Sequence, residues 1–245
     1  MLDVHPAHHA ASTWRDFFIH IATIVIGLFI AVGLEQTVEA IHHANERREL
    51  IAEMRDQAQL NVPIAHRDID VLLAQAEWFI AAAHAIEQTQ PVHGTVSLTL
   101  PPHAPFDHNI PVYRAVWPLA LSNGRAALLA DSQAKVYERL ERMNDRVDTA
   151  IERRNSFVFA QQREQLRLHI TIVPGARIAF PQTEMPSILG VLADRAASLR
   201  SEARWDAVIE AYNGAVANNI FDLSQAMASS DAESAAFDKR IATPN

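Results

Sequence analysis

The sequence predicts an all-α fold: an N-terminal transmembrane helix that continues into a long neck helix, followed by an antiparallel helical bundle with long helical hairpins. Three observations predict this fold. Residues 17–34 form an apolar run without a fixed charge. Apolar residues then recur at spacings of three and four over most of the chain, which is the period of a helix. Five of the twelve prolines fall in the segment 91–111, which marks a break between helices.

Length and composition restrict the class of protein. At 245 residues with 49% apolar side chains, the chain can bury a sizeable core and is not disordered as a whole. The 21 basic and 29 acidic residues give a net charge of −8, which argues against nucleic acid as a partner. Cysteine is absent and no glycine-rich phosphate loop occurs, so thiolate zinc sites and nucleotide binding through such loops are excluded.

The run from Phe17 to Leu34 has the length and the flanks of a membrane span. Its eighteen residues would form a helix about 27 Å long, close to the roughly 30 Å hydrocarbon thickness of a bilayer. Trp14 has the position of an interfacial anchor, and Glu35 ends the uncharged run. We therefore expect residues 1–16 to form a tail and residues 17–34 to form a retained single-pass anchor.

Two other interpretations of this run stay open. A helix that is buried on all sides in a soluble bundle is also apolar, although its apolar run is usually shorter. The small residues Ala31-Val32-Gly33 resemble a signal-peptide cleavage pattern. Against cleavage, the leading segment carries acidic residues and lacks the basic region of a signal peptide.

Small residues line one side of the expected span. Thr23, Gly27 and Ala31 follow one another at intervals of four and fall on one face of a helix. Such a stripe lets two helices approach closely in lipid, where packing drives association. It predicts that the anchor packs against a second copy of itself.

The expected neck, residues 35–49, contains the densest group of potential metal ligands. Glu39 and His42 form a Glu-x-x-His pair, and His43 and Glu46 stand one turn away from them. This spacing occurs in di-iron helix bundles, where two such pairs and further glutamates converge. Here the motif occurs once, so a second copy would have to come from a symmetric dimer. A hydrated helical neck is the favoured interpretation, and a metal site is the alternative.

Residues 50–227 are expected to form the α-helical domain. Pro63 is predicted to end the first helix, and residues 64–88 would return as the second arm of an antiparallel hairpin. This arm has a heptad seam that implies a partner helix, formed by Ile69, Leu72, Ala76, Phe79, Ala83 and Ile86. The proline-rich loop 91–111 follows, and its VSLTL stretch is a candidate for a short strand.

Two more helices are expected after this loop. Residues 112–129 are predicted to form a helix that ends near Asn123-Gly124. Asp131-Ser132 is expected to cap a helix that reaches about residue 170. The charges of this helix alternate in sign, which is typical of a solvated surface.

The last part of the chain begins with an irregular connection around Pro174-Gly175. Helices are then expected at residues 186–199 and 202–227. Residues 228–245 are rich in small polar side chains, so a flexible tail is predicted there.

Two stretches of the chain support a resemblance: WRDFFIHIATIVIGLFIAVGLEQTVE (14–39) and VWPLALSNGRAALLADSQAKVYERLE (116–141). Together they resemble a group of uncharacterised bacterial proteins with one N-terminal membrane helix of the GLLIALGLEQ type. In that group, a later helix pair carries a small-residue-Gly turn followed by a tyrosine-containing amphipathic helix. The resemblance covers roughly a fifth of the chain and implies a membrane-anchored α-helical domain. It transfers no catalytic residue, because the group has no established activity.

The histidines outside the neck fall into two groups. Those of the tail could chelate a metal, and those of the proline-rich loop could titrate near neutral pH. A mobile tail and an ordinary loop are the simpler interpretations. The two groups are His5, His8 and His9, and His93, His103 and His108.

Local catalytic motifs are missing from the sequence. No GxSxG, HExxH or cysteine nucleophile occurs, so no catalytic residue and no cofactor is predicted. A site that assembles in space from distant residues stays open. A protein without enzymatic activity is therefore favoured over an enzyme.

The favoured function is a membrane-anchored interaction or scaffold module of the bacterial cell envelope. Its partners would be the lipid bilayer and either further copies of itself or a membrane protein complex. One alternative is a ligand- or pH-sensing membrane-anchored domain. A second alternative is a metal-dependent enzyme that uses the Glu-x-x-His neck.

The expected location is the inner (cytoplasmic) membrane. Positive residues balance across the span, with Arg15 and the α-amino group on one side and Arg47 and Arg48 on the other. A short leading tail more often stays inside the cell. The domain is therefore expected on the periplasmic side.

Overall fold

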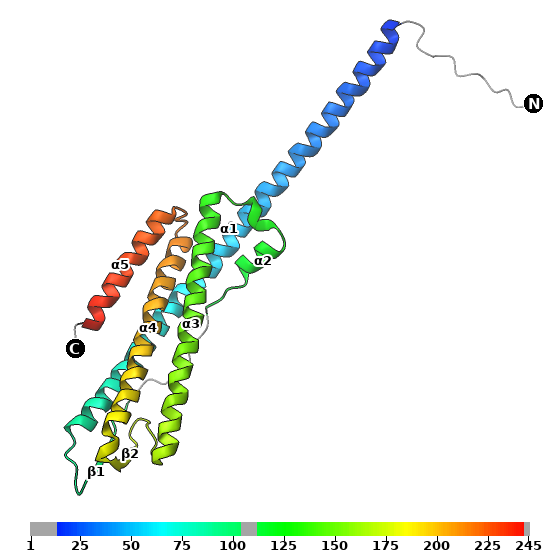
Figure 1. Ribbon diagram of the computed structural model, residues 1–245. Coiled ribbons are helices and arrows are strands. Elements are labelled where there is room, and N and C mark those ends of the chain that lie inside the picture. Colours follow the sequence, from blue (N-terminus) through cyan, green and yellow to red (C-terminus); the bar gives the residue numbers. More distant parts are fainter. Residues whose placement is uncertain (1–13, 104–111, 243–245) are drawn as a thin grey trace, which may run out of the picture. The chain divides into compact units, whose positions relative to one another are not determined.

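The protein is described here by a computed structural model that covers residues 14–103 and 112–242. Within these residues it contains five α-helices and two short strands, so the fold is all-α, as predicted (Figure 1). The helices are α1 (Trp14–Gln88), α2 (Val116–Ser122), α3 (Asp131–Leu168), α4 (Met185–Ala217) and α5 (Leu223–Ala242). The strands are β1 (Thr95–Thr99) and β2 (Arg177–Pro181), and the short 3-10 helices are η1 (Arg125–Leu128) and η2 (Gln182–Glu184).

The chain divides into two compact units between Glu49 and Leu50. Leu50 is the first residue of α1 that is buried, so the division falls where this helix begins to bury side chains. The first unit contains the start of α1. The second unit contains the rest of α1 and all the other helices and strands.

In the second unit, α1 and α4 pack against each other in antiparallel directions. His66 Nδ1 lies 3.0 Å from Glu210 Oε1, and Arg200 donates to Glu77 at 2.6 Å. Residues later in α1 thus meet residues earlier in α4. α4 supplies the partner helix that the heptad seam predicts.

The seam itself is confirmed. Its six residues are buried, except for Ala83, which is partly buried. They pack with a matching row from α4 that consists of Ile188, Leu192, Ala196, Leu199 and Ala203. Fully burying one leucine of such a row stabilises the fold by roughly 1.5–3 kcal/mol.

α4 is the central helix of the second unit, because α3 and α5 also pack against it (Figure 1). Arg154 of α3 donates to Glu202 of α4 at 2.8 Å, and Arg204 of α4 donates to Asp238 of α5 at 3.1 Å. α4 therefore buries residues on several faces, as a helix surrounded by neighbours must.

The predicted helix break at Pro63 is wrong, and with it the predicted hairpin. α1 continues through Pro63 to Gln88. Asn61 and Ala65, on either side of the proline, are buried in the second unit, so packing holds both flanks in the helix. Gln59, whose carbonyl loses its helical partner, is exposed and can bind water instead.

The segment before α2 is fixed by two polar side chains of α1. Asn61 accepts a hydrogen bond from the backbone N–H of Tyr113 at 2.7 Å and donates to its carbonyl at 2.8 Å. Gln57 accepts from the N–H of Val116 at 3.1 Å. α2 begins at Val116, four residues after the predicted start at Val112. It ends at Ser122 and Gly124 follows with a positive φ of 80°, so the predicted end near Asn123-Gly124 is confirmed.

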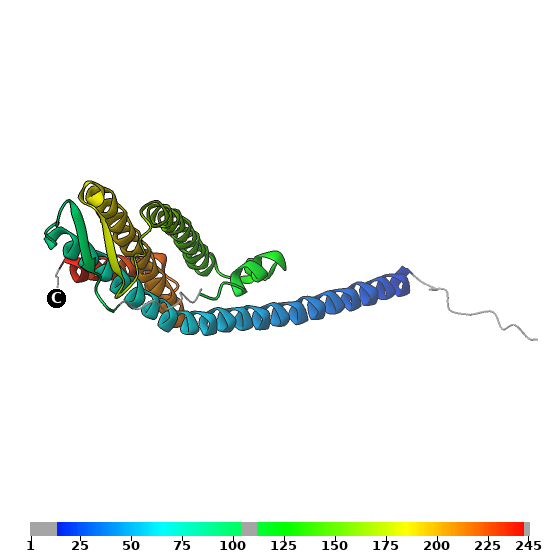
Figure 2. The same ribbon diagram turned by 90° about the horizontal axis from the view of Figure 1, so that it is seen from below.

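The two strands form an antiparallel ribbon in which Val96 pairs with Phe180 and Leu98 pairs with Ile178 (Figure 2). The predicted strand in the proline-rich loop is thus confirmed. Its partner β2 lies in the segment that we expected to be irregular. Ile178 and Phe180 alternate with exposed residues and are buried, which is the pattern of a strand with one covered face.

The predicted break between residues 199 and 202 is wrong, because α4 runs unbroken from Met185 to Ala217. Arg200 and Glu202 there are ion-paired with neighbouring helices, so these charges do not force a solvated turn. By contrast, the helix predicted up to residue 170 is confirmed, since α3 ends at Leu168.

The real break lies between α4 and α5. Asn219 has a left-handed backbone with a φ of 57°. Asp222 then accepts hydrogen bonds from the N–H groups of Ser224 and Gln225 at 2.8 and 3.1 Å, which is how a side chain caps a helix. α5 continues to Ala242 and buries Phe237, so the segment expected to be a flexible tail from residue 228 is helical.

Candidate functional site

The apolar start of α1 is exposed along its whole length. Among the described residues, α1 is the one helix long and apolar enough to cross a membrane, with a mean hydropathy of 2.5 over its best window. None of that window is buried in the protein, unlike the core helix of a soluble bundle. Phe29 and Ile30 are 73% and 67% exposed. A contiguous apolar surface of this size is typical of a site that meets lipid or another protein.

The polar side chains in this run are satisfied by their own helix. Thr23 donates to the carbonyl of Ile19 at 2.8 Å, and His20 Nδ1 lies 3.0 Å from the carbonyl of Asp16. These two hydrogen bonds satisfy the Thr23 hydroxyl proton and one ring nitrogen of His20 within the helix, which lowers the cost of placing the two side chains in lipid. Thr23, Gly27 and Ala31 are all exposed, so the packing stripe is free on the single chain, and self-association stays a prediction.

The four candidate metal ligands of the neck separate into two pairs. His42 lies 3.2 Å from Glu46, and His43 lies 4.0 Å from Glu39. All four are on the surface, and no group of three or more potential ligands converges anywhere in residues 14–103 and 112–242. The Glu39 and His42 pair is thus not joined by a third ligand from the same chain. A metal site would still need ligands from a second copy.

Two of the six other candidate histidines lie within the described residues, and both are exposed. His93 is exposed in the turn before β1, with a positive φ of 52°, and His103 is exposed as well. His5, His8, His9 and His108 lie outside the described residues.

A buried ionic cluster occupies the middle of the second unit, and sequence reasoning missed it. We define it as Asp68 of α1, Arg154 of α3, and Arg195, Glu202 and Asp206 of α4. The Arg154 guanidinium donates to Glu202, which is completely buried, and Arg195 stacks 5.2 Å from the ring centre of Phe79. On α4, Glu202 and Asp206 fall near the point where one apolar cluster ends at Ala207 and the next begins at Val208.

The electrostatics of this cluster are set by its burial. Burial raises the pKa of Asp206 well above the usual range, the nearby Glu202 and Asp68 carboxylates raise it further, and Arg154 opposes the rise. Burial also lowers the pKa of Arg195 to about 10, aided by Arg154 and opposed by Glu202. Asp206 therefore holds a proton to a higher pH than an ordinary aspartate does.

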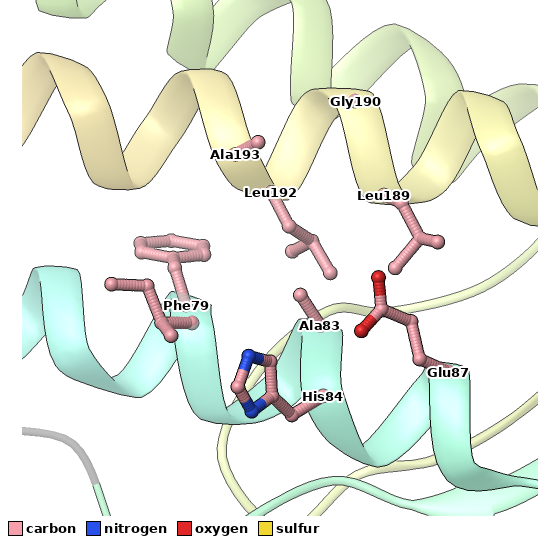
Figure 3. Close-up of a pocket in the computed structure, with 9 residues that line it drawn as sticks. Phe79, Ala83, His84, Glu87, Leu189, Gly190, Leu192 and Ala193 are labelled. Atoms are coloured by element: carbon pink, nitrogen blue, oxygen red, sulfur yellow. The ribbon is translucent and has the colours of Figure 1, made fainter.

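An open groove of about 390 Å³ lies between α1 and α4 (Figure 3). Its walls are mainly apolar and include Phe79, Ala83, Leu189 and Leu192, with His84 and Glu87 of α1 at the edge. His84 and Glu87 are exposed, so they have no low-dielectric environment that would adapt them for acid–base chemistry. The groove can bind apolar groups.

A second cavity, of about 400 Å³, lies among α3, α4 and α5, and we call it the three-helix pocket. Arg139 and Met143 of α3, Trp205 and Tyr212 of α4 and Ser230 of α5 are among its lining residues. Sequence reasoning treated the charges of α3 as a solvated surface. That interpretation is wrong for Arg139, which is half-buried and donates to the Tyr212 hydroxyl over 3.4 Å.

Comparison of the chain with protein-family models, with curated proteins and with solved structures finds no match in any of the three.

Proposed function

We propose that this chain is a membrane-anchored interaction module: a single span holds an α-helical bundle at the surface of a bacterial inner membrane. One observation carries the proposal. The run from Phe17 to Leu34 has no fixed charge, is long enough to cross a bilayer and is not buried in the protein.

The second unit supports an interaction role more than a catalytic one. Its open groove between α1 and α4 is mainly apolar, and its fully buried Glu202 carboxylate is held by an ion pair with Arg154. The stripe of Thr23, Gly27 and Ala31 favours association of the span with another copy. The proposed assembly is a homo-oligomer or a complex with another membrane protein, with the bundle on the periplasmic side.

The test of membrane anchoring is fractionation of cells that express the full chain. We expect the protein in the membrane pellet after ultracentrifugation, with release by detergent and not by alkaline carbonate. The molecular mass of the purified protein should show that residues 1–33 are still present. Recovery in the supernatant, or loss of these residues, contradicts a retained anchor.

A reporter fused to the C-terminus tests the side of the membrane. An enzyme that is active only in the periplasm should be active in this fusion, and one that is active only in the cytoplasm should not. The opposite result would place the bundle in the cytoplasm.

A ligand sensor on the same anchor is a second candidate function. The three-helix pocket favours it, since its volume falls within the range of pockets that bind small molecules. A sensor requires that ligand binding stabilise the bundle, which a thermal shift can measure.

A further inference from the structure

The three-helix pocket contains an arginine, Arg139, that forms no ion pair with the described residues. Arg139 is half-buried, and its one hydrogen bond within residues 14–103 and 112–242 joins its Nε to the neutral Tyr212 hydroxyl. Other partly buried arginines of this unit, Arg114 and Arg154, hold carboxylates at 2.5–2.8 Å. The planar guanidinium edge of Arg139 is thus left to bind an anion.

Hydroxyl groups on the pocket wall are also without a partner. Ser201 of α4 and Ser230 and Ser234 of α5 make no hydrogen bond to any described residue. Serines next to them on the same helices do: Ser198 donates to the carbonyl of Arg195 at 2.9 Å, and Ser229 to that of Gln225 at 3.1 Å.

Ser230 is the most informative of these hydroxyls. Its side chain is only 6% exposed, although it lines the pocket. Its hydroxyl makes no hydrogen bond to a described residue and lies at the pocket wall, so it can donate to an acceptor group of a ligand.

The remaining walls restrict the ligand further. Met143, Val208 and Met227 make part of the wall apolar, and Trp205 adds an aromatic face. Asp231 also lines the pocket and disfavours a ligand with two negative charges. Arg204 adds little net charge, because it pairs with Asp238 at 3.1 Å.

We propose that the three-helix pocket binds a small organic monocarboxylate, with its carboxylate on Arg139 and the Ser230 hydroxyl and its apolar part against Trp205. This inference does not depend on the membrane anchor. It would make the bundle a receptor for a small organic acid.

The experiment measures the thermal midpoint of the detergent-purified full chain with benzoate or butyrate at millimolar concentration. Neutral benzamide and an equal concentration of sodium chloride are the controls. We expect at least one carboxylate to raise the midpoint while benzamide and chloride do not. The inference is overturned if neither carboxylate raises the midpoint, if benzamide does so equally, or if inorganic phosphate stabilises more strongly.

Two matched pairs of variants locate the binding site. Arg139→Gln should weaken carboxylate binding by about tenfold to a hundredfold, because it removes a charge-assisted hydrogen bond. Arg142→Gln makes the same change on an exposed part of α3 and should leave binding as it is. Equal binding by both variants would place the ligand elsewhere.

The second pair of variants tests the same binding site independently, in case Arg139→Gln does not fold. Ser230→Ala should weaken carboxylate binding by a few-fold to tenfold, and Ser229→Ala, one position away and exposed, should not. Unchanged binding by Ser230→Ala would contradict the assigned position of the carboxylate.

Discussion

The hydroxyl of Tyr137 is buried and has no hydrogen-bond partner in the part of the chain that the structure describes, although its ring is well packed. The side chain is 1% exposed, and its ring lies 5.5 Å from that of Trp117 and 5.8 Å from that of Phe221. Burial raises the pKa of this hydroxyl, so it stays neutral at any ordinary pH. The ring stabilises the core, while the hydroxyl only carries a desolvation cost.

We therefore expect Tyr137→Phe to raise the free energy of unfolding by about 1 kcal/mol. Tyr212→Phe is the matched control, because the Tyr212 hydroxyl accepts a hydrogen bond from Arg139, and it should lower stability by about 1 kcal/mol. Thermal denaturation followed by circular dichroism measures both. A Tyr137→Phe variant less stable than wild type would mean that the hydroxyl has a partner.

Asp206 makes stability depend on pH. Its folded pKa is raised above the usual 3.8 by burial beside Glu202 and Asp68, while Arg154 opposes the rise. Folding therefore favours its protonated form. This contribution to stability is complete below the usual pKa and is lost as the pH rises through the raised one.

We expect Asp206→Asn, which is neutral at every pH, to lose less thermal stability than wild type as the pH rises from acidic to alkaline. Asp194→Asn, an exposed site on the same helix, should follow the wild-type curve. The measurement is the thermal midpoint across this pH range. Parallel curves for Asp206→Asn and wild type would show that Asp206 does not cause the dependence.

At the scale of the helix, Pro63 is a residue that disfavours the helix interior in which it lies. A proline in a helix interior is about 3 kcal/mol less favourable than alanine. Pro63→Ala should restore the hydrogen bond to the carbonyl of Gln59 and raise the free energy of unfolding by about 1–3 kcal/mol.

Pro186→Ala is the control for this change. Pro186 lies in the first turn of α4, where its missing N–H has no intrahelical acceptor, so the effect should be close to zero. Thermal unfolding of the two variants compares them directly. An equal response at both positions would mean that the helix at Pro63 is not strained by the proline.

The helices that sequence could predict are those in which one local signal dominates. The seam from Ile69 to Ile86 is a strict heptad, and α3 shows its apolar period from Val136 onwards. Helix boundaries that depend on contacts with residues distant in the sequence could not be predicted. Packing of Asn61 and Ala65 carries α1 through Pro63, and the Arg154 ion pair lets Glu202 stay inside α4.

The same reasoning applies to the candidate sites. The exposed apolar run of α1 could be predicted, because all its information lies in one contiguous stretch of residues, 17–34. The buried ionic cluster and the three-helix pocket join residues more than 50 positions apart, from Asp68 to Asp206 and from Arg139 to Ser230. Their register is set by helix packing, which the sequence alone did not reveal.

At the scale of the whole molecule, the anchor and the bundle contribute different properties. The anchor is exposed and apolar, whereas the bundle has its own two apolar clusters. Changes within the span should therefore alter where the protein is found and leave the fold of the bundle unchanged.

Two arginines in the middle of the span test this separation. Ile24→Arg with Leu28→Arg adds about 3 kcal/mol to the cost of insertion for each residue, so the membrane fraction should fall steeply. Val38→Arg with Ile41→Arg, in the exposed neck, should leave it unchanged. Fractionation measures both double variants. Equal membrane recovery would contradict a span at residues 17–34.

Self-association of the span needs a different substitution. Gly27→Leu should weaken the signal of a membrane dimerisation reporter, because it adds bulk within the small-residue stripe. Gly33→Leu is the control, since Gly33 lies on another face and a Cβ added at either glycine would meet no described atom within 4 Å outside the backbone of the helix itself. A signal that Gly27→Leu leaves unchanged contradicts packing through this face.

The order of synthesis constrains how the bundle forms. The ribosome makes α1 and α3 before α4, yet α4 is the helix on which both bury their apolar residues. Neither can complete its core until Ala217 has left the ribosome. A chain that stops short of α4 would leave both earlier helices with uncovered apolar faces, and we expect such a product to aggregate or to be degraded.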